Sequence, residues 1–127
     1  MPLVRIDLLQ GKSAAYRKTI GDVVYDAMTK VINVPQDDRF MVVTEHPASG
    51  LVFDPKYLEI QRSENCVFIQ VFLNQGRTVE MKKAFYKFIS EELNARLGHR
   101  QEDVLISLVE VPKENWSFGN GIAQYAV

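Results

Sequence analysis

The feature that most constrains the fold is an ungapped internal repeat with an offset of 65 residues. The stretch LQGKSAAYRKTI begins at Leu9, and the related stretch NQGRTVEMKKAF begins at Asn74. We therefore divide the single domain of residues 1–127 into repeat one at about 2–47, repeat two at about 67–112 and a C-terminal tail at 113–127. The same offset aligns Gln10 with Gln75, Gly11 with Gly76, Lys12 with Arg77, Ser13 with Thr78, Lys18 with Lys83, Asp38 with Asp103, Glu45 with Glu110 and Pro47 with Pro112.

Each copy is predicted to form a strand, a turn, a helix and a second strand. The strands VRIDLL and CVFIQVFL each lead through a glycine to a helix N-cap candidate, Ser13 in repeat one and Thr78 in repeat two. The first helix should end before Val34-Pro35, and Gly98 stands where a helix-ending glycine belongs. The strands FMVV and VLISLVEV follow. Apolar residues recur at helical spacing after each cap candidate: Tyr16, Ile20, Val23, Val24, Ala27, Met28 and Val31, then Met81, Phe85, Phe88, Ile89, Leu93 and Leu97.

Two tandem βαβ units predict an α/β fold with both helices on one face of a four-stranded mixed sheet. Right-handed crossovers make the two strands of each unit parallel. The strands CVFIQVFL and VLISLVEV are apolar on both faces, so the face without helices also needs a cover. The linker between the repeats and the tail are too short to supply it. We expect other subunits to cover this face in a closed homo-oligomer.

Composition narrows the class of protein further. The formal charge of −1 gives no electrostatic footprint for nucleic acid or an anionic membrane. No apolar run is longer than a strand, and the first residues lack the build of a signal peptide, so we expect a cytoplasmic protein. The single Cys66 is expected in the core, and His46 and His99, which have no ligand-spaced partner, at the surface. We predict no metal and no cofactor.

Pro2 is the residue on which the functional interpretation depends. A proline at the first position of a strand is common, because proline lacks the N–H that a sheet ladder needs. If Met1 is removed, however, Pro2 becomes a free secondary amine. An N-terminal amine titrates near pH 7.7–8.0 in model peptides, about 2.5 units below lysine, so it can act as a base near neutrality. Both interpretations are open from position alone.

The predicted topology brings Pro2 close to a loop that suits an anion. When the first strands of the two repeats pair antiparallel, Pro2 lies near the loop Asn74-Gln75-Gly76-Arg77-Thr78. This loop carries a cation, a glycine and the open N–H groups of a helix start. A small carboxylate substrate would fit this arrangement. A residue type that occurs in both repeats is more readily explained by the fold than by a reaction. Asp38 has such a counterpart in Asp103, whereas the counterpart of Pro2 is Val67.

Several stretches of the chain resemble one known superfamily. The N-terminal strand PLVRIDLL, the duplicated βαβ unit and Arg77 just before the second helix resemble the tautomerase superfamily, the group of 4-oxalocrotonate tautomerase and macrophage migration inhibitory factor. Within it, VPQDDRF, QRSENCVF, KKAFYKFI, DVLISLVE and NWSFGNG are similar to malonate semialdehyde decarboxylase and its relatives. The similarity covers nearly the whole chain, and WSFG together with VP-x-x-DR is fairly specific for this subgroup.

The resemblance implies a homotrimer with active sites near the subunit boundaries. It implies that Pro2 is the catalytic proline, Asp38 the catalytic aspartate and Arg77 a substrate-binding arginine, and that the aromatic wall of the site consists of Trp116 and Phe118. One position departs from the pattern. The decarboxylase has an arginine two positions before the residue that matches Arg77, and this chain has Gln75 there.

The charge on Pro2 separates two chemistries. Arg77 and the apolar wall disfavour a second positive charge and lower the pKa of the amine, which would leave a neutral base for keto-enol tautomerisation of a small carboxylate-bearing enol or 2-oxo acid. A neighbouring Asp38 carboxylate would hold the amine protonated, as a decarboxylase or hydratase requires. We predict the tautomerase, with the decarboxylase as the first alternative. The second alternative is a non-enzymatic oligomeric binding module.

Overall fold

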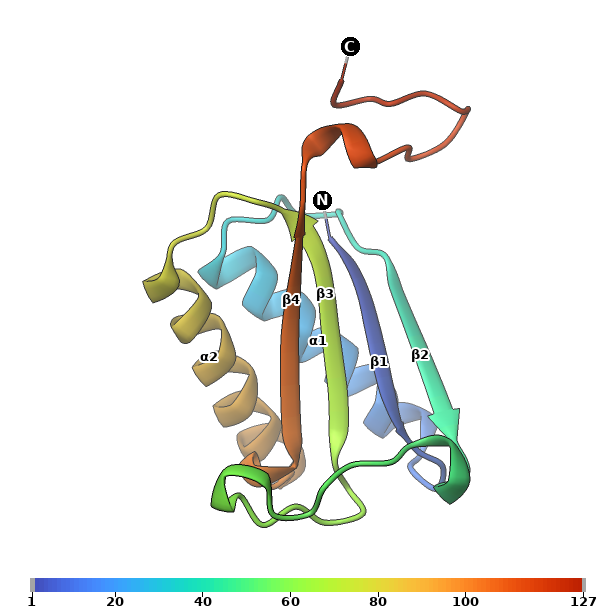
Figure 1. The fold of residues 1–127 in the computed structure, drawn as a ribbon, viewed down its shortest axis with the longest axis vertical. Helices are drawn as coiled ribbons and strands as arrows, with labels where there is room; N and C mark the ends of the chain where they lie inside the picture. The colour runs from blue at the N-terminus through green and yellow to red at the C-terminus, as the bar shows by residue number, and fades with distance from the viewer. Residues whose placement is uncertain (1, 127) are drawn as a thin grey trace.

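The computed structural model describes residues 2–126 and consists of a four-stranded sheet with two helices packed on one face (Figure 1). The elements are β1 (Leu3–Leu9), α1 (Ala14–Val31), β2 (Met41–His46), β3 (Val67–Asn74), α2 (Val79–Leu97) and β4 (Val104–Val111). The strands lie in the order β2-β1-β3-β4. A short 3-10 turn follows each of β2, α2 and β4, and one more lies in the linker before β3.

The pairing of the strands confirms the predicted topology. Within each repeat the strands are parallel, with Val4 opposite Met41 in repeat one and the corresponding pairing of β3 with β4 in repeat two. The two repeats join through the antiparallel pair β1 and β3, in which Leu3 lies opposite Phe72 and Leu8 opposite Val67. Each repeat therefore begins beside the end of the other repeat's first strand.

Both helices begin and end as the sequence predicts. The Ser13 hydroxyl accepts from the backbone N–H of Tyr16, and the Thr78 hydroxyl accepts from that of Met81. Such caps satisfy N–H groups that have no partner within the helix. The first helix ends at Val31, ahead of Val34-Pro35. The second ends at Gly98, whose φ of 64° is the left-handed conformation that favours glycine.

The core lies between the sheet and the two helices. It contains alternate residues of β1 and β3 and the inward faces of α1 and α2, among them Ile6, Ile69, Phe85 and Ile89. Cys66 is fully buried at the start of β3, as predicted, and burial raises the pKa of its thiol to about 11. A thiol in this setting is protonated and unreactive near neutral pH.

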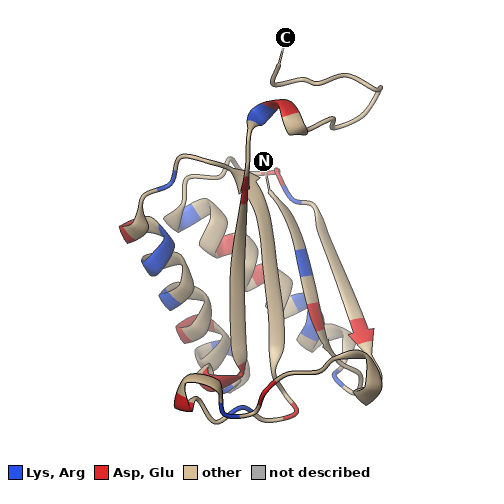
Figure 2. Ribbon diagram, viewed as in Figure 1, with Lys and Arg blue, Asp and Glu red and all other residues tan. Residues whose placement is uncertain are grey.

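The face of the sheet opposite the helices is only partly covered. Leu105 on β4 is 40% exposed, and Leu3 and Val42 are also exposed. The linker covers one end of this face, where the ring of Phe53 packs edge-on against Phe68. Figure 2 shows that the strands β3 and β4 carry almost no charge, whereas the helices and the linker are rich in charged residues.

The two repeats share one ion pair at corresponding positions. Arg17 on α1 pairs with Glu45 at 3.2 Å, and Lys82 on α2 pairs with Glu110 at 2.6 Å. Each pair joins the first turn of a helix to the end of the strand that follows that helix in its repeat. The duplicated glutamates are therefore structural, as their presence in both repeats predicts.

The prediction that His99 lies at the surface is wrong. His99 is only 3% exposed, because it follows the end of α2 and lies between the Tyr16 hydroxyl and the backbone carbonyl of Asp103. His46 is partly buried and pairs with Asp7 at 2.6 Å.

Within residues 2–126 no helix is long and apolar enough to cross a membrane. The same residues contain no cluster of three or more histidine, cysteine or acidic side chains placed to hold a metal.

Candidate active site

The start of β1 lies at the end of the sheet where the C-terminal tail also lies (Figure 1), and Pro2 lines a hollow with residues of that tail. The backbone N–H of Val4 donates to the carbonyl of Phe40 at 2.9 Å, which fixes the start of β1 beside the start of β2. On the other side, Leu3 is opposite Phe72, close to the end of β3. Pro2, just before β1, therefore lies near the start of β2 on one side and the end of β3 on the other. Its side chain is buried.

Pro2 faces a hollow of about 200 Å³ whose walls are mostly aromatic. Leu3, Phe40, Trp116, Ser117 and Phe118 complete its lining. The rings of Trp116 and Phe118 stack with centroids 5.4 Å apart and planes 15° apart. The structure thus brings together Pro2 and both aromatic residues that the sequence predicts for the site.

Trp116 is fixed by a hydrogen bond to the end of β3. Its indole N–H donates to the side-chain oxygen of Asn74 at 2.8 Å. A buried indole usually finds such a partner, because an unpaired N–H costs free energy. The bond anchors the C-terminal tail to the sheet and sets the orientation of the wall beside Pro2.

Asp38 lies in an adjoining hollow that shares Phe40 and Phe118 with the Pro2 hollow. The residue is only 4% exposed, and burial raises the pKa of its carboxyl group. Tyr125 lines the same hollow, and the pKa of its hydroxyl is raised by burial and by the negative charge of Asp38. The two hollows therefore adjoin at Phe40 and Phe118, with Pro2 in the lining of one and Asp38 in the lining of the other.

Arg77 lies in the loop after β3 and is held by two backbone carbonyls. Its Nε donates to the carbonyl of Ile32 at 3.1 Å, and one terminal nitrogen donates to the carbonyl of Asn74 at 3.0 Å. Arg77 is not among the residues that line the Pro2 hollow. Gln75 is exposed and lines a third hollow, which it shares with Tyr125 and the tail.

One backbone N–H of the loop before α2 is bound by a carboxylate of the same chain. The backbone N–H of Gly76 donates to the Glu110 carboxylate at 3.2 Å, and Lys82 pairs with the same carboxylate. These contacts lower the pKa of Glu110, with Lys82 as the main cause. The Gly76 N–H therefore already has a partner within the chain, the Glu110 carboxylate.

Three further residues of the site were not assigned to it from the sequence. Phe40 packs near Phe118 with ring centroids 6.2 Å apart, and Tyr125 packs edge-on against Phe118 at 5.2 Å. In the sequence Asn74 stands only as the first residue of the Arg77 loop, with no sign of its contact to Trp116. The signal for Phe40 was available, since it ends the VPQDDRF stretch, whereas Tyr125 depends on how the tail folds back.

A family model for tautomerase enzymes matches residues 38–119, and a second tautomerase model matches residues 2–61. This chain belongs to the tautomerase superfamily, in its malonate semialdehyde decarboxylase-like subgroup. Among curated relatives, a probable tautomerase of Bacillus subtilis, YusQ, is 40% identical over 98% of this chain and 98% of its own length. A second probable tautomerase of that organism, YrdN, is 34% identical over 98% and 96%.

Solved structures of this superfamily have the same fold. A malonate semialdehyde decarboxylase superposes with a TM-score of 0.90 at 32% identity, covering 97% of this chain and 95% of that one. The FG41 malonate semialdehyde decarboxylase inhibited by 3-bromopropiolate gives a TM-score of 0.89 at 41% identity, with coverage of 97% and 93%. A fused 4-OT, described as a symmetric trimer, gives 0.78 at 25% identity, with coverage of 98% of both chains.

We predict that Asn74→Ala loosens the aromatic wall of this tautomerase-superfamily site. Loss of the hydrogen bond leaves the indole N–H of Trp116 without its acceptor and should cost about 1 kcal/mol. Trp116 is the single tryptophan. Its indole signal in ¹⁵N NMR spectra should therefore shift, and its exchange with solvent should become faster. Asn94→Ala, on α2, is the matched control; equal indole exchange in both variants would contradict the anchoring role of Asn74.

Proposed function

We propose that this chain is a cofactor-free enzyme that uses the amine of Pro2 to tautomerise a small carboxylate-bearing enol or 2-oxo acid. The observation that carries the proposal is the burial of Pro2 in a hollow walled by Trp116 and Phe118. An apolar wall disfavours a charged amine and so supports a neutral base. The reaction requires removal of Met1, which lies outside the residues that the structure describes.

The proposed reaction moves one proton. The Pro2 nitrogen accepts the proton of the enol hydroxyl, the carbonyl forms as the carbon–carbon double bond shifts, and the same nitrogen delivers a proton to carbon. Nothing is oxidised or reduced, so no cofactor is needed. The water-poor aromatic hollow strengthens the electrostatic interactions of the reacting groups.

We assign Arg77 to the substrate carboxylate. A guanidinium has five N–H donors, and in residues 2–126 the carbonyls of Ile32 and Asn74 take two of them. The others can bind a carboxylate, and the two backbone contacts hold the group in position beforehand. Gln75 is assigned a supporting contact, because it can offer hydrogen bonds but no charge.

Decarboxylation is the second candidate, and Asp38 is the residue that favours it. A buried carboxylate beside the Pro2 hollow stabilises a protonated amine if it is ionised. A protonated Pro2 could then polarise an aldehyde carbonyl while the bond to the departing carboxylate breaks and carbon dioxide leaves. Two of the similar solved structures are malonate semialdehyde decarboxylases.

We also propose that the enzyme is a homotrimer. The exposed apolar side chains Leu3, Val42 and Leu105 lie on the sheet face that the helices do not cover. The fused 4-OT of similar fold is a symmetric trimer. Burying this face against two other copies would remove its apolar surface from water.

The first functional prediction concerns Pro2 and Arg77. With 2-hydroxymuconate or phenylenolpyruvate as substrate, Pro2→Ala should lower kcat/KM by about 10²- to 10⁴-fold, the usual contribution of a positioned base. Arg77→Ala should lower it by about tenfold or more, because a hydrogen bond to a charged group is lost. Ketonisation is followed by ultraviolet absorbance.

Two controls make this experiment decisive. Mass spectrometry establishes whether Met1 has been removed, and Lys83→Ala, an exposed lysine on α2, should leave kcat/KM unchanged. If Arg77→Ala retained full activity, the carboxylate assignment would be wrong. Retained Met1 in protein from its native cell, with no turnover of any enol acid, would favour the non-enzymatic binding module instead.

The second functional prediction tests the missing charge at position 75. Gln75→Arg adds a charged donor two positions before Arg77, at the hollow that Gln75 shares with Lys113 and Tyr125. Charge-assisted hydrogen bonds are about twice as strong as neutral ones. The variant should therefore raise decarboxylation of malonate semialdehyde more than ketonisation of phenylenolpyruvate, measured side by side. Gln75→Glu is the control of opposite charge and should lower both rates.

The third prediction concerns assembly. Light scattering at micromolar concentration should give about three times the chain mass of 14.5 kDa. Leu105→Lys should dissociate the trimer, because it places a charge on the apolar face. Val79→Lys changes an exposed residue on α2 and should leave the mass unchanged. A native chain that scattered as a monomer would contradict the proposed cover of the sheet.

A further inference from the structure

A separate cavity lies at the opposite end of the sheet from Pro2. It has a volume of about 270 Å³ and is formed by the end of β1, the loop before α1, the linker before β3 and the segment after α2. This is slightly below the size of pockets that hold drug-sized ligands, so it suits a molecule of a few heavy atoms. Its lining residues are Leu8, Leu9, Gln10, Gly11, Lys12, Tyr16, Glu64, Asn65 and His99.

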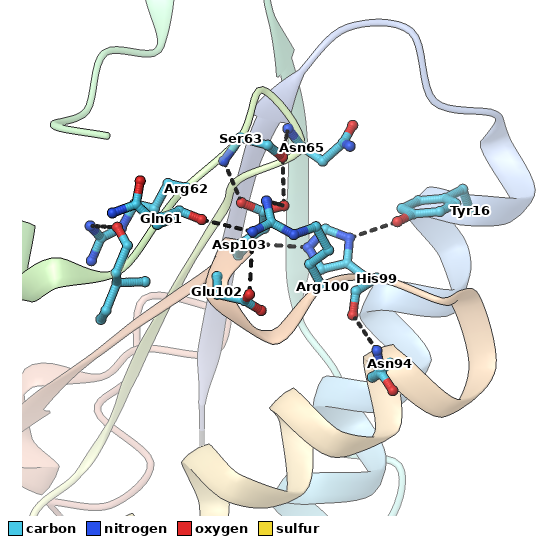
Figure 3. Close-up of polar contacts among 11 residues, drawn as sticks. Tyr16, Gln61, Arg62, Ser63, Asn65, Asn94, His99, Arg100, Glu102 and Asp103 are labelled. Carbon is cyan, nitrogen blue, oxygen red and sulfur yellow. Dashed lines mark hydrogen bonds and ion pairs between the residues drawn. The ribbon is translucent and has the colours of Figure 1, made fainter. Parts of the chain in front are cut away.

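A chain of hydrogen bonds forms one wall of this cavity (Figure 3). The hydroxyl of Tyr16 and Nδ1 of His99 are 2.6 Å apart, and Nε2 of His99 is 3.0 Å from the backbone carbonyl of Asp103. The Asp103 carboxylate is held in turn by the N–H and hydroxyl of Ser63, at 2.7 and 2.6 Å. The histidine ring therefore cannot turn without breaking both of its contacts.

The carbonyl of Asp103 determines which nitrogen of His99 carries a proton. A carbonyl only accepts, so Nε2 must donate to it in every protonation state. In the neutral ring Nδ1 then accepts from the Tyr16 hydroxyl, and that hydroxyl has no proton left for a ligand. In the protonated ring Nδ1 donates to the Tyr16 oxygen instead. The hydroxyl proton must then turn away from His99 and becomes available to the cavity that Tyr16 lines.

Lys12 supplies a positive charge on the same wall. Its Nζ lies 4.8 Å from the centroid of the Tyr16 ring, a cation–π contact that holds the ammonium over the ring. Lys12 occupies the position in repeat one that Arg77 occupies in repeat two. The first turn of α1 contains no acidic residue, so the positive end of that helix is not neutralised there.

We propose that this cavity is a second ligand site, which binds a small carboxylate anion. Lys12 provides the cation, and the Tyr16 hydroxyl provides a hydrogen bond whose direction is set by the charge of His99. The site carries no reacting amine, since Val67 takes the place of Pro2 in repeat two and is joined to Cys66 by a peptide bond. It binds and does not catalyse, and it does not depend on the function proposed for Pro2.

The proposal implies that the anion and a proton bind together. Only the protonated ring leaves the Tyr16 hydroxyl proton available to a ligand, so affinity for the anion should rise as the pH falls. The titratable and charged groups around His99 are Tyr16 from α1, Lys12 from the preceding loop, Glu64 from the linker before β3, and Arg100 and Asp103 from the segment after α2.

NMR titration with propionate, using the full-length chain, tests the site directly. The side-chain signals of His99 report the cavity, and the indole signal of the single Trp116 reports the Pro2 end. Propionate should shift the His99 signals and should bind roughly tenfold more tightly at pH 6 than at pH 8, the effect of a hydrogen bond to a charged group. Propionamide, which is similar in size but neutral, should leave them unchanged.

Two variants separate the contributions. Lys12→Met should weaken propionate binding about tenfold at both pH values, because it removes the cation. Tyr16→Phe should remove most of the pH dependence while preserving the ring. Lys18→Met is the matched control, since Lys18 lies on α1 but pairs with Asp22 away from the cavity. Thermal unfolding establishes whether each variant is folded. If Tyr16→Phe does not fold, Lys12→Met still tests the proposal.

Three results would overturn the proposal. Propionate could shift only the Trp116 signal, which would place the anion at the Pro2 end. Propionate and propionamide could shift the His99 signals equally, which would exclude a site for charge. Lys12→Met could also bind as tightly as the native chain. Loss of tautomerase activity in Pro2→Ala with unchanged binding at His99 would show the two sites to be independent, as proposed.

Discussion

The antiparallel pairing of β1 with β3 is the constraint on which the rest of the structure depends. It joins the two βαβ units into one sheet. It also places the start of each repeat beside the loop that leaves the first strand of the other repeat. Pro2 thereby reaches the loop of Arg77, and Val67 reaches the loop of Lys12. The molecule consequently has two related ends, and both carry a hollow.

The chain makes these two related ends chemically different. At one end lies Pro2, whose free amine after removal of Met1 is our proposal, whereas its counterpart Val67 is an amide within the chain. The additional segments also differ: the tail brings Trp116 and Phe118 over Pro2, and the linker brings Ser63 to Asp103. A duplicated frame can thus hold one reacting site and one binding site, since the segments that close the two ends are not duplicated.

Sequence patterns predict the duplicated part of this molecule well and the unduplicated part poorly. Cap residues such as Ser13 and Thr78 accept a hydrogen bond from an N–H three residues later, and helical spacing is a pattern within a single element. Both can therefore be recognised without the tertiary structure. Pro2 could be placed because one strand pairing determines its neighbours. The burial of His99 and the closure of Tyr125 over Phe118 could not be predicted, because they depend on the paths of the linker and the tail.

The placement of Arg77 explains why a single carboxylate suits the proposed site. Its guanidinium is bound by two backbone carbonyls, so little side-chain freedom is lost when an anion binds to its free donors. The neighbouring loop contributes no second cation, because Gln75 is neutral and Glu110 occupies the Gly76 N–H. Proton transfer between oxygen and carbon needs one anchored carboxylate and a base. Decarboxylation must also hold the departing group out of plane, and at the position two before Arg77 the chain offers the neutral amide of Gln75.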